Sequence, residues 1–77
     1  MKENLLNYGK AILENMRDLG TDVVIFNRFL CFFRDGNYEM CKDFHTYNLR
    51  WLDSQPLKEE IIMFYKLVKQ YISIIEK

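Results

Sequence analysis

Hydrophobic residues recur every three or four positions near the start of the chain, which is the spacing of a helix with one buried face. Over residues 3–19 the recurring positions are Leu5, Tyr8, Ile12, Met16 and Leu19. Gly20 follows directly, where a helix often ends in a left-handed backbone conformation. The pattern therefore predicts a helix from about Glu3 to Leu19 that ends at Gly20.

The carboxyl-terminal segment shows the same spacing over a longer stretch. Its apolar positions are Leu57, Ile61, Phe64, Val68, Tyr71, Ile72 and Ile75. Ser54 can cap the start of such a helix, and Pro56 suits its first turn. Glu59 and Glu60 would lie near the positive end of the helix dipole. We therefore predict a helix from Pro56 to about Glu76.

The middle of the chain supports two interpretations. Residues 23–33 are rich in β-branched and aromatic side chains, and Asp35-Gly36 is a dipeptide that favours a tight hairpin. In the helical alternative, Thr21 caps a helix from Asp22 to Arg34 and Gly36 ends it. Asn37 then caps a further helix that runs to about Leu52.

Periodicity favours the helical interpretation of this segment. Alternation of apolar and polar residues stops after Phe44, whereas helical spacing continues to the end of the segment. The residues at helical spacing are Tyr38, Cys41, His45, Leu49 and Leu52. We therefore predict an all-α fold, a small four-helix bundle in one domain over residues 1–77. The alternative is an α+β fold with a central β-hairpin, within residues 22–45, between two helices.

Residues 35–41, Asp-Gly-Asn-Tyr-Glu-Met-Cys, resemble the turn between the two helices of a tetratricopeptide repeat. That family places a Gly, a polar residue, a Tyr and then a small residue at this spacing. Phe32 would match the aromatic residue late in its first helix, and Cys41 the small residue in its second. The resemblance covers residues 22–56, less than half of the chain and one repeat unit. It implies a helical hairpin and a protein-binding role, and it assigns no site residues.

Charge and length exclude several classes of function. Eleven basic and eleven acidic residues give a net charge of zero, which argues against nucleic-acid binding and against a polybasic membrane surface. The longest apolar stretch, residues 23–33, is shorter than the roughly 20 residues of a membrane span. Residues 1–10 lack the apolar run of a secretory signal. We therefore expect a cytoplasmic protein in which Cys31 and Cys41 are reduced, buried thiols.

The residues that could carry chemistry are few. Cys41 and His45 would share a helical face, but one His and two Cys without a Cys-x-x-Cys pair fall short of the usual metal-site pattern. A Cys–His nucleophile would need an exposed, activated thiolate. Three isolated glycines form no phosphate-binding loop. The sequence therefore predicts no catalytic residue, no metal and no cofactor, and a protein that is not an enzyme.

The surplus of aromatic and apolar side chains is the most informative feature, at 16% aromatic and 49% hydrophobic residues. Trp, Tyr and Met are enriched where proteins bind one another. The predicted contact residues are Met40, Tyr47, Trp51, Ile62, Met63 and Ile74. The alternative is that these side chains form one wide buried stripe.

Together these features favour a small protein-binding domain, an adaptor or an inhibitor of a larger protein, self-associated as a dimer. The composition, rich in Lys, Asn, Ile and Tyr, resembles that of small accessory proteins of low-GC bacteria and of their phages and plasmids. That resemblance implies a host or defence protein as the target. The alternative function is a small dimeric nucleic-acid-binding regulator that uses Arg28, Arg34 and Arg50.

Overall fold

The computed structural model describes residues 1–76, except for the side chain of His45. Its helical segments are α1 (Lys2–Asp18), α2 (Val24–Arg34), α3 (Tyr38–Lys42), α4 (Phe44–Tyr47), α5 (Leu49–Asp53) and α6 (Lys58–Ile75). No strand occurs among these residues, so the prediction of an all-α helical bundle is confirmed. The alternative with a β-hairpin in residues 22–45 is wrong.

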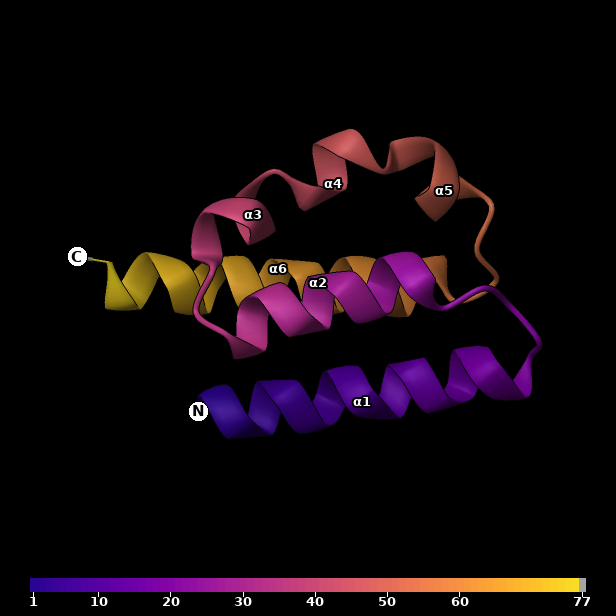
Figure 1. Cartoon of the computed structure of the whole chain (residues 1–77), viewed down its shortest axis with the longest axis horizontal. Coiled ribbons are helices and arrows are strands. Elements are labelled where there is room, and N and C mark those ends of the chain that lie inside the picture. Colours follow the sequence, from indigo (N-terminus) through magenta and orange to yellow (C-terminus); the bar gives the residue numbers. More distant parts are fainter. Residues whose placement is uncertain (77) are drawn as a thin grey trace.

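Three long helices lie side by side, and a chain of short helices packs against α2 and α6 (Figure 1). Helices α2 and α6 run in the same direction, and α1 runs opposite to both. The segment α3–α5 returns along the side away from α1, so both termini lie at one end of the bundle (Figure 1). The described chain measures 38 × 24 × 19 Å along its principal axes.

The dipeptide Asp35-Gly36 ends a helix because Gly36 adopts a φ of +79°, which suits the residue just past a helical carboxyl terminus. The Gly36 N–H donates to the carbonyl of Phe33 (3.2 Å), and the Asn37 N–H donates to the carbonyl of Phe32 (2.8 Å). These two bonds satisfy two of the last four carbonyls of α2. Gly20, with a φ of +73°, ends α1 in the same way, as predicted.

The start of α2 differs from the prediction. The Thr21 hydroxyl donates to the carbonyl of Met16 (2.9 Å), so it closes α1 and does not cap α2. The residue at the start of α2 is Val23, and no side-chain capping bond is made there, although the Asp22 carboxylate accepts the Val24 N–H at 2.9 Å. The predicted cap at Thr21 is therefore wrong.

The predicted helix from Asn37 to Leu52 is divided into α3, α4 and α5. The Tyr65 hydroxyl, from α6, donates to the carbonyl of Lys42 at 2.5 Å. The Asn48 side-chain amide donates to the carbonyl of Phe44 at 2.9 Å. In a continuous helix these two carbonyls would accept backbone N–H groups four residues later. Side-chain donors therefore compete with the helical hydrogen bonds at both breaks.

Helix α6 starts later than the sequence predicts. The Ser54 hydroxyl donates to the carbonyl of Trp51 (2.6 Å), so it closes α5, and no side chain caps α6. Pro56 lies in the turn before the helix, which begins at Lys58. The predicted Ser54 cap and the predicted start at Pro56 are therefore wrong. Glu59 and Glu60 do lie in the first turn.

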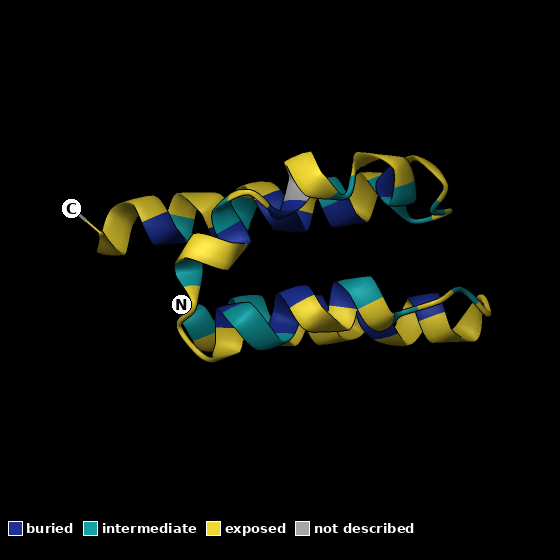
Figure 2. Cartoon of the chain, turned by 45° about the horizontal axis from the view of Figure 1, so that its top comes forward, coloured by how far each residue is buried: buried dark blue, intermediate teal, exposed yellow. Residues whose placement is uncertain are grey.

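Aromatic rings from different elements meet in the core. Phe64 is fully buried, and its ring centroid lies 5.6 Å from that of Tyr8, 5.6 Å from that of Phe26 and 6.0 Å from that of Phe29. Phe29 also contacts Phe44, with 4.6 Å between ring centroids. Figure 2 shows the buried residues on the helix faces that turn towards one another. Aromatic packing thus holds α1, α2, α4 and α6 together.

Candidate protein-interaction site

The six predicted contact residues fall into two groups. Tyr47, Ile74, Met63 and Met40 are exposed, with exposed fractions of 81%, 57%, 53% and 51%. Trp51 and Ile62 are half-buried and pack against the core. The structure brings Met40 and Tyr47 together, at one groove, and places Ile74 at another.

The first groove lies between α2 and the segment α3–α4, and we call it the α2–α4 groove. Its lining residues are Ile25, Arg28, Phe32, Met40, Phe44, Tyr47 and Asn48. It encloses about 160 Å³, which is below the roughly 300–1,000 Å³ of small-molecule sites. The size suits protein side chains better than a bound metabolite.

Helix α2 builds one wall of this groove because it carries large side chains on two faces. Phe26, Phe29 and Phe33 are buried in the core. Ile25 and Phe32 are half-buried on the other face. Helical spacing places Arg28 between them on that same face. Because the helix is apolar on both faces, its sequence alone does not show which side chains face the core and which line the groove.

Helix α4 builds the opposite wall. Phe44 is anchored against the core through its contact with Phe29. Tyr47 comes three residues later and projects into solvent, with 81% of its side chain exposed. Large exposed aromatic residues next to an apolar groove are typical of protein-binding surfaces.

Arg28 carries the one charge among the described lining residues of the α2–α4 groove. It forms no ion pair with any residue in the described part of the chain. Asn48, at the end of the groove, uses its amide N–H to bond the carbonyl of Phe44. As far as the structure describes its lining, the groove is therefore mostly apolar and carries one unpaired cation.

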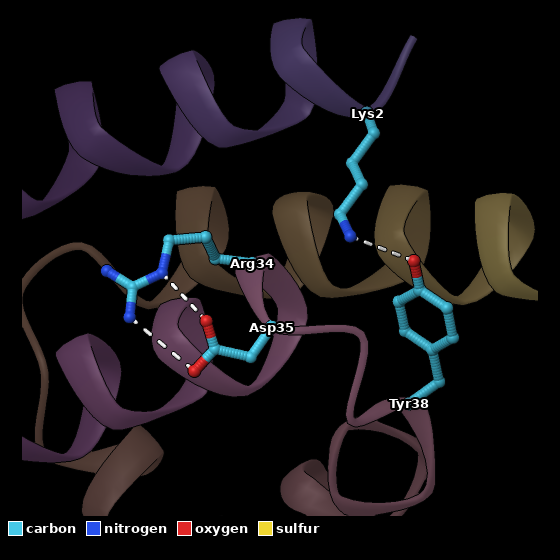
Figure 3. Close-up of polar contacts among 4 residues, drawn as sticks. All are labelled: Lys2, Arg34, Asp35 and Tyr38. Atoms are coloured by element: carbon cyan, nitrogen blue, oxygen red, sulfur yellow. Dashed lines mark hydrogen bonds and ion pairs between the residues drawn. The ribbon is translucent and has the colours of Figure 1, made fainter.

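The other two arginines of the predicted basic face lie in different surroundings. Arg34 donates to both carboxylate oxygens of Asp35, at 3.0 and 3.5 Å (Figure 3). This hydrogen bond raises the pKa of Arg34 and lowers that of Asp35. Arg50 is exposed on α5. Arg34 is therefore already neutralised within the chain.

Two lysines are likewise engaged within the chain. The Lys2 ammonium donates to the Tyr38 hydroxyl at 3.0 Å (Figure 3), and it lies 5.5 Å from the centroid of the Phe33 ring. Lys42 pairs with Glu76 at 2.7 Å and with Glu39 at 3.1 Å. The hydrogen bond to Glu76, followed by that to Glu39, raises the pKa of Lys42.

A second groove lies between the start of α1 and the end of α6. Its lining residues are Met1, Leu5, Leu67, Gln70, Tyr71 and Ile74, and it encloses about 190 Å³. None of these side chains is charged. Met63 lies on the same face of α6 as the lining residues Leu67 and Gln70, because the three positions are spaced by four and three residues.

Trp51 lies in the packing of α5 against α6. It lines a small internal space together with Phe44, Ile61 and Tyr65. Its indole nitrogen is buried and has no hydrogen-bond partner in the described part of the chain, and the same holds for the side-chain oxygen of Gln55. A buried polar group without a partner costs about 1–3 kcal/mol.

The two thiols differ in burial. Cys41 is 1% exposed and Cys31 is half-buried, and both are free. Burial raises the pKa of Cys41 to about 12. The side chain of His45, the predicted neighbour of Cys41, lies outside the described residues. No group of three His, Cys, Asp or Glu residues that could hold a metal ion occurs in the described part.

Thiol labelling is therefore expected to separate the two cysteines. With a pKa of about 12, about one Cys41 side chain in 10,000 is ionised at pH 8, and it is also shielded from reagent. We expect Cys31 to react with a disulfide reagent in the native protein and Cys41 to react after unfolding in urea. The variants Cys31→Ser and Cys41→Ser assign each reaction by mass spectrometry. Labelling of native Cys41 as fast as Cys31 would contradict this expectation.

None of the described helices combines the length and the apolar character that a membrane span requires. Comparison with protein-family models, with curated proteins and with solved structures gives no match for this chain.

Proposed function

We propose that this chain is a non-enzymatic protein-binding domain that acts as an adaptor or an inhibitor of a larger protein. The observation that carries the proposal is the α2–α4 groove, where Met40 and Tyr47 are exposed beside half-buried apolar residues and Arg28. Met, Tyr and Arg are among the residue types enriched at interfaces. The proposal includes self-association as a dimer, because Met63 and Ile74 leave further apolar surface exposed on α6.

The identity of the target is a further part of the proposal. The resemblance in composition to accessory proteins of phages and plasmids supports a host or defence protein as the one that is inhibited. The resemblance of residues 35–41 to a tetratricopeptide turn supports protein binding in general. The alternative, a dimeric nucleic-acid-binding regulator, has less support because the net charge is zero and Arg34 is paired with Asp35.

Site-specific photocrosslinking in the cells that produce the protein tests this function. A benzophenone amino acid at Tyr47 is expected to yield a discrete crosslinked protein, because this position is the most exposed aromatic of the groove. The same amino acid at Asn15, exposed on α1 across the bundle from α4 (Figure 1), is the matched control. Light scattering on the purified chain measures whether it is a dimer.

The crosslink at Tyr47 should also weaken severalfold when Met40 is replaced by alanine, because Met40 lines the same groove. Equal crosslinking from Tyr47 and Asn15, or none from either position, would reject the α2–α4 groove as a protein-binding site.

A further inference from the structure

We propose that the α2–α4 groove binds a partner segment that carries a carboxylate next to a large apolar side chain, with the carboxylate paired to Arg28. This inference rests on the proposed protein-binding function and specifies the chemistry of the partner. Three properties of the groove carry it: its charge, its apolar lining and its size.

The charge of the groove comes from Arg28. Several cations in the described part are matched by a carboxylate of the chain itself, as Arg17 is by Glu14 and Lys58 is by Asp53. Arg28 has no such match in the described part of the chain, and none of the described lining residues of the groove is a carboxylate. A guanidinium is weakly hydrated and presents planar donors that fit a carboxylate in a bidentate manner. A partner carboxylate at this point would complete the pairing that the chain leaves open.

The apolar lining requires a second feature in the partner. Ile25 and Phe32 are half-buried, while Met40 and Tyr47 rise on the far side and are exposed. Methionine adapts its shape to an inserted side chain, and tyrosine offers a rigid contact at little entropic cost. An aliphatic or aromatic side chain of the partner would therefore bury apolar surface on both walls. The enclosed volume of about 160 Å³ fits such a side chain rather than a folded domain.

A carboxylate agrees with this surface better than a phosphate backbone does. Nucleic acids bind through several cations that follow the phosphates. Among the described lining residues, Arg28 is the one cation, and the residues around it are mostly apolar. We therefore infer a peptide segment with acidic and apolar residues as the ligand, in an extended or helical conformation.

A display library of random peptides, selected against the whole chain, tests the inference. Peptides that bind the unmodified chain are expected to carry Asp or Glu within about two residues of Leu, Phe or Trp. Against Arg28→Glu, the same peptides should bind at least about tenfold more weakly, and a new selection should favour Lys or Arg at that position. Arg50→Glu makes the same charge change outside the groove and should leave the selected peptides unchanged.

The double variant Met40→Ala/Tyr47→Ala separates the inference from the proposed function. The selected peptides could depend on Met40 and Tyr47 but carry no acidic residue. That result would overturn the inferred pairing of a partner carboxylate with Arg28, and it would still support the groove as a protein-binding site. If the peptides bind this double variant as tightly as the unmodified chain, both the inferred ligand and the proposed protein-binding groove are overturned. Selection of no peptide, together with a dimer that Arg28→Glu dissociates, would mean that a second copy occupies the groove, and this result also overturns the inference.

Discussion

Replacing Phe64 with alanine is expected to lower the free energy of unfolding by about 3–5 kcal/mol. Phe64 has no exposed surface, and its ring contacts Tyr8 of α1 and Phe26 and Phe29 of α2. Its removal would leave a cavity where three helices meet. Because the whole stability of a small domain is about 5–15 kcal/mol, the variant would lose a large share of its stability. Urea unfolding followed by circular dichroism measures the change.

Lys66 is the matched control for this prediction, since it lies two residues after Phe64 on the same helix and is exposed. We expect Lys66→Ala to change the free energy of unfolding by less than about 0.5 kcal/mol. A loss below about 1 kcal/mol in Phe64→Ala, or equal losses in the two variants, would contradict the observed core.

The second large effect is expected at Gly9, which is buried on α1. A Cβ atom at this position would lie 2.4 Å from Cδ2 of Leu30 and 2.8 Å from Cζ of Phe64, closer than carbon atoms can approach. We therefore expect Gly9→Val to lower the free energy of unfolding by about 2–3 kcal/mol, because overpacking exceeds the gain in helix propensity. Thermal and urea unfolding provide the measurement.

Ala11→Val introduces the same side chain at an exposed position of α1 and should cost about 0.5 kcal/mol. The variant Leu30→Ala should be better tolerated when Gly9 is alanine than when it is glycine, because it removes the atom in closest contact. If Gly9→Ala and Leu30→Ala changed the free energy of unfolding additively, α1 and α2 would not approach each other as closely as they do in the structure.

Much of the fold could be predicted from local chemistry. The helix ends at Gly20 and Gly36 follow from the left-handed backbone conformation, which glycine adopts without strain. The long helices follow from apolar spacing, which repeats with the helical turn. Leu19 and Ile75 continue the predicted stripes but are exposed, because they lie at the ends of α1 and α6.

The candidate site could be predicted in part. Met40 and Tyr47 are predicted as contact residues from their residue type, and the structure places them at one groove. Ile25 and Phe32 were missed as groove residues, because they lie on a helix that is apolar on two faces. Arg28 was predicted for a different function, as part of a basic face, and its place in the groove depends on how α4 packs across α2.

The sequence by itself determined that this chain forms helices and where α1 and α2 end, because periodicity and glycine act over a few neighbouring residues. The tertiary structure decided where the third predicted helix breaks and which apolar side chains remain outside. The break at Lys42 involves a hydroxyl from Tyr65, 23 residues later in the chain. Such a contact exists only after α6 has packed, so no local pattern around Lys42 could reveal it.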